Sequence, residues 1–172
     1  ALGATPANAD VNDFSYESWD ATYELSLDES GRAVAKVTET LVPVFPDFDQ
    51  NRGIIRGLPL RYEGAPAAPE NISVTDETGA SVPFTLEDDE TFRSILVGDD
   101  SFVHGRQTYV ISYTLHDVVL AATDTNADEF FWDILPLERW QNVQQFSATV
   151  DLSTDLASQL TDQAACYVGQ AN

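Results

Sequence analysis

The chain has 172 residues, of which 29 are Asp or Glu and 8 are Lys or Arg, so its formal net charge is −21. This charge repels both phosphate backbones and anionic lipid, and we therefore expect neither nucleic-acid binding nor direct binding to an anionic membrane. The hydrophobic fraction of 43% is typical of a folded protein, and the length fits one domain with a core.

The first residues predict a flexible segment over 1–12, followed by a single domain over 13–172. The opening stretch has neither the basic start nor the apolar centre of a signal peptide, and no apolar run approaches the ~20 residues of a membrane span. The chain also lacks an initiator methionine. We therefore expect a processed or excised piece from which targeting or anchoring parts have been removed.

Strand patterns dominate the rest of the chain. Over 19–27, apolar and polar residues alternate with a period of two, which is typical of a half-buried strand. The turn residues "DESG" and a second β-branched run follow, so residues 18–45 predict a β-hairpin. The stretch 71–86 repeats this form, with a "DETGA" turn between two alternating runs, and predicts a second hairpin.

Further alternating runs cover 91–98, 106–119, 129–135 and 142–152. In the third quarter of the chain, Tyr109, Ile111, Tyr113 and Leu115 share one face, and in the last run Phe146, Ala148, Val150 and Leu152 do so. Eight or nine strands at this spacing predict an all-β fold, an antiparallel β-sandwich of immunoglobulin-like or jelly-roll-like type with little helix. A short helix is predicted within 153–165, with Ser153 as its cap.

Three of the eight basic residues fall within 47–64, namely Arg52, Arg56 and Arg61. In an extended strand, Arg56 shares its face with Ile54 and Leu58. Glu39 likewise shares a face with Val37 and Leu41. A lone buried charge costs several kcal/mol, whereas a hydrogen-bonded pair can roughly break even.

The alternation therefore predicts a structural ion pair between Glu39 and Arg56, in which the planar guanidinium engages the carboxylate through two bonds. Arg52 and Arg61 are interpreted as surface charges that neutralise acidic neighbours. The alternative is a site for an anionic ligand in this segment, although no Gly-rich phosphate loop accompanies it.

No catalytic motif stands out, and we expect no enzyme activity. His104 and His116 lie in different settings without metal-ligand spacing, and no nucleophile elbow, Walker loop or zinc-protease motif is present. Among 29 acidic residues, a carboxylate pair for glycoside hydrolysis cannot be singled out. No cofactor is expected, with calcium as the one open case.

Calcium is considered because two acidic loops have oxygen ligands at alternate positions. One loop offers Asp124, Asn126 and Asp128, and the other spans 47–51. Neither has the glycine at position six or the glutamate at position twelve of a helix–loop–helix calcium site. Ordinary acidic loops are the competing interpretation.

Aromatic residues offer a possible sugar platform at Trp132 and Trp140. An exposed coplanar pair would favour this hypothesis, whereas burial would make both tryptophans ordinary parts of a sandwich core. The single cysteine, Cys166, is interpreted either as one half of a disulfide whose partner lies downstream or as a buried inert thiol.

Four stretches together carry a family resemblance: "GRAVAKVTETL", "NRGIIRGLPL", "GRQTYVISYTL" and "EFFWDILPLERWQNVQQFSATVDL". Their order resembles the extracytoplasmic N-terminal domain of a bacterial family of predicted membrane proteins of unknown function, over about 13–152. The resemblance implies a β-sandwich outside the membrane, attached to a transmembrane region of the same protein. It implies no catalytic residues.

Two functions follow as hypotheses. The first is a non-catalytic extracytoplasmic module of a membrane-anchored envelope protein, serving in assembly, partner binding or ligand sensing. Its partners would be its own transmembrane region and an envelope protein or glycan. The second is a carbohydrate-binding or carbohydrate-processing domain. A concave site with converging polar groups would separate the second from the first.

Overall fold

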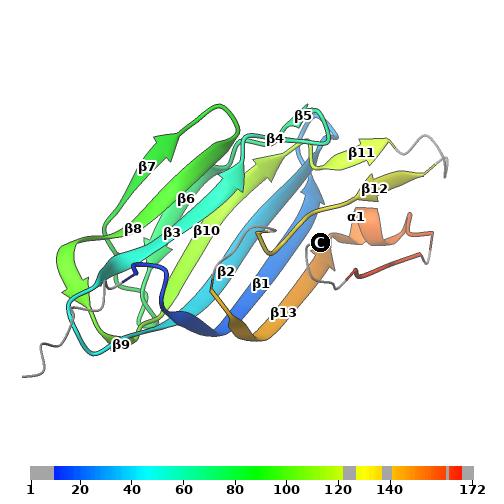
Figure 1. Cartoon of the computed structure of the whole chain (residues 1–172). Helices are drawn as coiled ribbons and strands as arrows, with labels where there is room; N and C mark the ends of the chain where they lie inside the picture. The colour runs from blue at the N-terminus through cyan, green and yellow to red at the C-terminus, as the bar shows by residue number, and fades with distance from the viewer. Residues whose placement is uncertain (1–9, 122–126, 137–140, 162, 168–172) are drawn as a thin grey trace, which may run out of the picture.

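A computed structural model describes residues 10–121, 127–136, 141–161 and 163–167. Most of these residues form strands in two layers (Figure 1). The larger sheet has the order β13-β1-β2-β10-β6, with β9 paired to the end of β2, and the smaller sheet has the order β3-β8-β7. Two small hairpins, β4-β5 and β11-β12, complete the described strands.

The strands of the larger sheet are β13 (Val143–Leu152), β1 (Ser15–Leu27), β2 (Ala33–Phe45), β10 (Tyr109–His116), β6 (Glu70–Thr75) and β9 (Gly105–Arg106). Those of the smaller sheet are β3 (Asn51–Pro59), β8 (Phe92–Val103) and β7 (Phe84–Asp88). The hairpin strands are β4 (Arg61–Tyr62), β5 (Ala65–Pro66), β11 (Val119–Ala121) and β12 (Asp128–Phe130). The predicted all-β sandwich with little helix is confirmed.

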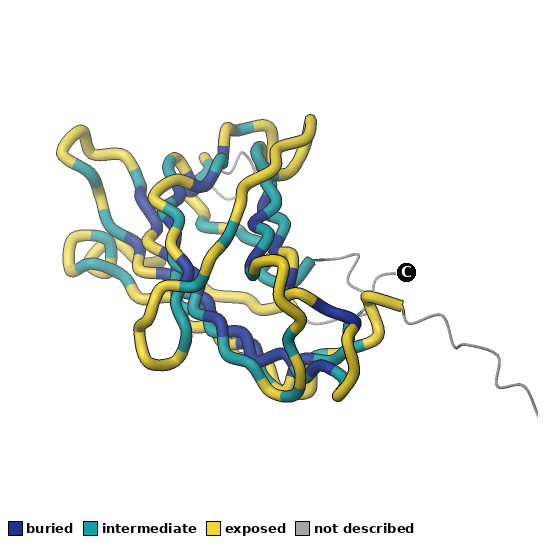
Figure 2. Tube along the Cα trace, turned by 90° about the vertical axis from the view of Figure 1, so that its left-hand side faces the viewer, coloured by how far each residue is buried: buried dark blue, intermediate teal, exposed yellow. Residues whose placement is uncertain are grey.

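The core lies between the sheets, as the alternation predicts. Every second residue of β1 from Trp19 to Leu25 is buried. Every second residue of β10 from Tyr109 to Leu115 is buried as well. The smaller sheet contributes Ile54, Leu58 and Ile95 to the same cluster. Figure 2 shows the buried stretches towards the middle of the domain, with exposed turns around them.

The hairpin over 18–45 is confirmed, because β1 and β2 pair antiparallel. Its turn is held by Asp28, whose Oδ1 accepts hydrogen bonds from the backbone N–H groups of Ser30 and Arg32 at 2.8 and 2.9 Å. Such a side-chain bond mimics a backbone turn, which explains why Asp opens it.

The second predicted hairpin is wrong. β6 belongs to the larger sheet and β7 to the smaller one, and only an isolated bridge joins Thr75 to Ser81. Pro83 stands just before β7 and has no N–H to donate to a ladder, which favours leaving the first sheet at this point. The Pro83 carbonyl instead accepts a hydrogen bond from the backbone N–H of Gly98, which belongs to the smaller sheet.

The sequence predicted an antiparallel sandwich, and most of the strand pairs are antiparallel, but one pair in the larger sheet is parallel. β13 pairs with β1 in parallel, with Trp19 opposite Phe146 and Tyr23 opposite Val150. This strand enters the sheet beside the first strand of the chain, after a long connection from β10. Such a closure depends on tertiary contacts that alternation alone does not reveal.

The ends of the domain differ in detail from expectation. Of the segment 1–12, residues 1–9 lie outside the described residues, while the carbonyl of Val11 accepts a hydrogen bond from Asn51 at 2.7 Å. The predicted short helix is α1 (Thr154–Ala157), four residues long. Ser153 occupies its N-cap position but makes no side-chain capping bond. Within the described ranges, no helix combines the length and apolarity needed to span a membrane.

A glycine pair sets the side-chain directions of β3. Gly53 and Gly98 face one another across β3 and β8 with φ values of +138° and +120°, at a register shift after Asn51. A Cβ on Gly53 would overlap the Val97 carbonyl, and one on Gly98 would overlap the Arg52 carbonyl. The extra residues of this irregularity lie in β8, between Gly98 and Val103, and Asn51 and Arg56 on β3 are both buried.

We expect Gly53→Ala to destabilise the domain by about 3 kcal/mol or more, because it combines a backbone conformation that only glycine tolerates with a backbone overlap. Gly79→Ala is the control, since Gly79 also has positive φ (+84°) but open space around its Cβ. It should cost only about 1 kcal/mol. Urea unfolding of the variants measures both, and equal losses would contradict the steric argument.

Candidate functional site

The most polar part of the core is a buried ion pair between the two sheets. Glu39 of β2 is 0% exposed and Arg56 of β3 is 3% exposed. Arg56 Nε donates to Glu39 Oε2 and Arg56 Nη2 to Glu39 Oε1, both at 2.8 Å. The structure thus brings together the two residues that the alternation predicted, in a two-bond arrangement.

Further hydrogen bonds satisfy the remaining polar atoms of the pair. Tyr113 of β10 donates its hydroxyl to Glu39 Oε1 at 2.6 Å. Arg56 also donates from Nη1 to the Gly57 carbonyl at 2.9 Å and from Nη2 to the Ile134 carbonyl at 3.2 Å. The guanidinium carbon lies 5.0 Å from the centre of the Trp19 ring, within cation–π range.

Sequence reasoning missed Tyr113 as a member of this group. The signal was present, because Tyr113 lies on the predicted inward face of its strand. The sequence does not reveal the register between β10 and β2. In this register Ile111 lies opposite Glu39, and Tyr113 is two residues further along β10 on the same face. Tyrosine in a core normally finds such a hydrogen-bond acceptor.

The protonation states of this group follow from its surroundings. Burial lowers the pKa of Arg56, but the adjacent Glu39 carboxylate outweighs it and holds the pKa above its ordinary value. Burial, reinforced by the Glu39 charge, raises the pKa of Tyr113 well above 10. The pKa of Tyr23 is raised for the same two reasons. Tyr113 therefore remains a proton donor, and the group as a whole carries no net charge.

The other two arginines of the segment 47–64 do not converge with Arg56. Arg52 donates from Nε to the Asp100 carbonyl at 2.9 Å and lies over the Phe102 ring at 4.5 Å. Arg61 donates to the Gly64 carbonyl at 2.5 Å. Both are exposed, as expected, but their described hydrogen bonds go to backbone carbonyls instead of the predicted carboxylates.

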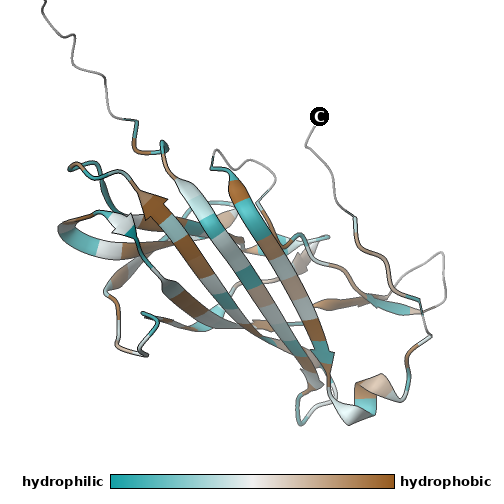
Figure 3. Ribbon diagram, turned by 90° about the horizontal axis from the view of Figure 1, so that it is seen from below, coloured by the Kyte–Doolittle hydropathy of each residue, from teal (hydrophilic) through white to brown (hydrophobic). Residues whose placement is uncertain are grey.

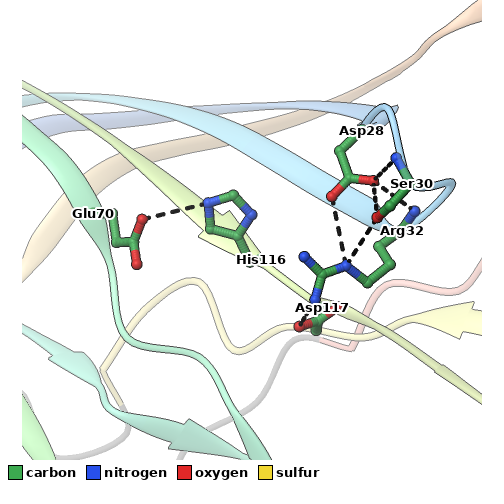
Figure 4. A network of polar contacts seen from close by, with 6 residues as sticks. All are labelled: Asp28, Ser30, Arg32, Glu70, His116 and Asp117. Atoms are coloured by element: carbon green, nitrogen blue, oxygen red, sulfur yellow. Dashed lines mark hydrogen bonds and ion pairs between the residues drawn. The ribbon is translucent and has the colours of Figure 1, made fainter.

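Elsewhere, arginines pair with the acidic surface. Arg93 engages Asp88 through two bonds of 2.7 and 2.8 Å, and Arg106 bonds Glu17 at 3.2 Å. At the turn between β1 and β2, Arg32 lies 3.6 Å from both Asp28 and Asp117 (Figure 4). These pairs are exposed or partly exposed, where each contributes at most about 1 kcal/mol.

The same end of the sandwich holds one of the two histidines. His116 Nε2 lies 3.6 Å from Glu70 (Figure 4), and the other histidine, His104, lies 2.9 Å from Asp49. The Ser30 hydroxyl and the turn N–H of Arg32 lower the pKa of Asp28 to about 2. In the part of the chain that the structure describes, no three His, Cys, Asp or Glu side chains gather as metal ligands would.

The calcium hypothesis is only partly addressed by the structure. Asp124 and Asn126 lie outside the described residues, and Asp128 is an exposed residue of β12 opposite Ala121. In the second loop, Asn51 binds the N-terminal segment and Asp49 faces His104. These two side chains therefore already have protein partners.

The aromatic platform is likewise incomplete. Trp132 is half-buried and packs on the core, with its ring centre 4.7 Å from that of Tyr62 and tilted by 39°. Phe131 is 44% exposed and lies 6.0 Å from Tyr62 at an angle of 38°. Trp140 lies outside the described residues. The described rings are thus tilted to one another and do not form a coplanar pair.

Open space on the described surface is shallow. A groove of about 230 Å³ lies at one end of the sandwich, lined among others by Arg52, Asp76, Asp99 and Tyr109. A cavity of about 10 Å³, barely the size of one water, lies beside Tyr62 and Trp132.

Among the described strands, β13 has a neighbour on one side only, and this free edge is the surface feature that sequence reasoning missed. All its residues except the first and last are exposed, on both faces of the strand. Phe146 and Val150 share the inward face with buried Trp19 and Tyr23, yet are 41% and 45% exposed. Figure 3 shows β13 as the strand that leads into the helix, with apolar bands and few polar ones.

Cys166 is exposed, so the interpretation as a buried inert thiol is wrong. The alternative, a disulfide to a downstream cysteine, remains a hypothesis.

These features define an acidic β-sandwich with an internal ion pair and an open sheet edge. Residues 19–165 match the family described as predicted membrane protein (DUF2207) N-terminal domain, and the chain belongs to that family. The resemblance seen in the sequence is thereby confirmed. No curated protein matches the chain in sequence.

Similarity to solved structures is remote. The native leukotriene A4 hydrolase of Saccharomyces cerevisiae matches with a TM-score of 0.35 and 16% identity, over 69% of this chain and 16% of that one. A complex of the yeast enzyme with bestatin gives 0.34 and 15%, over 73% of this chain and 18% of that one. The domain thus spans under a fifth of these enzymes, and the likeness carries no functional argument.

We expect Arg56→Leu to lower the free energy of unfolding by ~3–5 kcal/mol, because it leaves the Glu39 carboxylate buried without its cation. The double change with Glu39→Leu should recover much of this loss. It leaves the Tyr113 hydroxyl unpaired at a cost of about 1–3 kcal/mol, which Tyr113→Phe should then remove. Denaturant unfolding of these three variants and the unchanged protein measures the series. A double variant at least as unstable as Arg56→Leu alone would show that the pair does not act as a unit.

Proposed function

We propose that this domain is a non-catalytic partner-binding module on the extracytoplasmic side of a membrane-anchored protein, and that β13 is its binding edge. The single observation that carries the proposal is the open edge at β13, whose inward-facing apolar residues Phe146 and Val150 are only partly covered. An exposed strand edge offers unpaired N–H and C=O groups, to which an extended segment of a partner can add.

Two further observations support this function. The family description places the domain in a predicted membrane protein, which supports attachment to a membrane. The described arginines bind carboxylates, carbonyls or ring faces within the domain itself, so the acidic exterior is suited to staying solvated beside a membrane. In this proposal the ion pair of Glu39 and Arg56 is scaffold, and neither histidine is a catalyst.

The glycan alternative requires different observations. A sugar site would need the exposed coplanar rings that Tyr62, Phe131 and Trp132 do not form among the described residues. The 230 Å³ groove is large enough for a small ligand and would become the first candidate if β13 proved inert.

Cys166 tests the orientation. In intact cells that make the full-length membrane protein, a membrane-impermeant maleimide applied after mild reduction should label Cys166, because the thiol is exposed. The Cys166→Ser protein is the matched control and should lose the label. Labelling that appears only after the cells are lysed would place the domain on the cytoplasmic side.

Hydrogen exchange tests the binding edge. We expect amides of residues 143–152 to exchange more slowly in the full-length protein in its native membrane than in the dilute 172-residue domain, because a bound strand would protect them. The short, acidic edge strand β7 is the internal control and should exchange equally in both. Equal exchange of β13 in the two settings would rule out this edge as the binding site.

A further inference from the structure

We propose that the strand which adds to β13 is β13 of a second copy, paired antiparallel about a two-fold axis at Ala148. This inference rests on the proposed role of β13 as the binding edge and names its partner. Pairing in this way would join the larger sheets of the two copies into one continuous sheet. The partly covered apolar faces of the two β13 strands would then lie next to each other on the same side of that sheet.

The other sheet edges carry features that oppose such pairing. β6 contains Asn71 at positive φ and a register shift against β10, and β7 ends in Glu87 and Asp88. β3 has a register shift against β8 between Asn51 and Gly53 and ends at Pro59. Bulges, charges and prolines are the usual protections of free edges.

β13 lacks these protections. It is ten residues long, contains neither proline nor glycine, and pairs with β1 without a register shift. Its first eight residues, 143–150, carry no charge, in a chain whose charged residues make up 22% of the total. This uncharged edge is therefore where two copies of a strongly acidic domain can approach each other with least repulsion.

The sequence of β13 is complementary to itself when reversed. With Ala148 opposite Ala148 of the second copy, Phe146 lies opposite Val150, and Ser147 lies opposite Thr149. Asp151, the one charge, lies opposite Gln145. At the centre of the pairing, apolar residues thus meet apolar residues on one face and polar residues meet polar residues on the other, while at its ends Gln144 lies opposite Leu152. No like charges face each other directly. A two-fold contact of this kind closes on itself and does not propagate into a fibre.

Electrostatics set the strength of this dimer. Each copy carries a formal charge of −21, so long-range repulsion opposes association in dilute solution. Salt screens that repulsion within about 10 Å at 0.1 M, so the dimer should strengthen as salt is added. In the full-length protein, a shared membrane would raise the effective concentration of the copies.

The test uses disulfide trapping in the 172-residue chain. In a Cys166→Ser background, Ala148→Cys should form a disulfide-linked dimer under mild oxidation, because the two cysteines would be direct cross-strand neighbours. Gln144→Cys is the matched control on the same face of the same strand. In this register, its sulfur would be about 27 Å from its counterpart, at ~3.4 Å per residue, and it should stay monomeric.

Sedimentation of the same chain without added cysteines should show a dimer fraction that rises with NaCl. Failure of Ala148→Cys to cross-link, equal cross-linking of Gln144→Cys, or dissociation by salt would each overturn the proposal. If cross-linking fails while β13 remains protected from exchange in the membrane, the binding edge stands and its partner is a different strand. If both fail, the proposed function fails as well.

Discussion

The structure depends on how the Glu39 carboxylate and the Arg56 guanidinium are satisfied inside the core. Each charge alone would be too costly to bury, and both are accommodated because Arg56 donates four hydrogen bonds and Glu39 accepts three. The partners come from separate parts of the chain: β2 and β10 of the larger sheet, β3 of the smaller sheet and the segment at Ile134. We interpret the pair as the feature that fixes where the smaller sheet sits on the larger one.

The backbone geometry of β3 serves the same end. Without the irregular backbone at Gly53, Asn51 and Arg56, an odd number of positions apart, would point to opposite faces of the strand. With it, Asn51 holds the N-terminal segment through Val11, while Arg56 reaches across the core. Because a well-packed hydrophobic core is often as stable as one with a buried ion pair, our hypothesis is that the pair contributes the selectivity of this register. The planar guanidinium bonds both carboxylate oxygens of Glu39 at once, a fork geometry that the compact ammonium of lysine does not offer.

The exterior follows a different rule from the core. The described arginines are engaged by carboxylates, carbonyls or ring faces, so the large negative charge remains as a solvated shell around the sandwich. Such a shell keeps a domain soluble and disfavours nonspecific association with other molecules. Against this background the uncharged stretch of β13 stands out, because it is the long edge strand where neither charge nor backbone irregularity guards the free hydrogen-bonding groups.

The sequence by itself determined the fold class, the main inward-facing residues and the pairing of Glu39 with Arg56. Alternation with a period of two assigns each side chain to a face, and a charge on an apolar face needs a partner of opposite sign there. It could not determine which strands share a sheet. Pro83 ends a ladder, but only the packing shows that β7 then joins the opposite layer. Tyr113 was assigned to the correct face, yet its bond to Glu39 depends on the register between β10 and β2. The parallel pairing of β13 with β1, and the edge that it leaves open, were decided by contacts between residues more than a hundred positions apart, which local patterns do not encode.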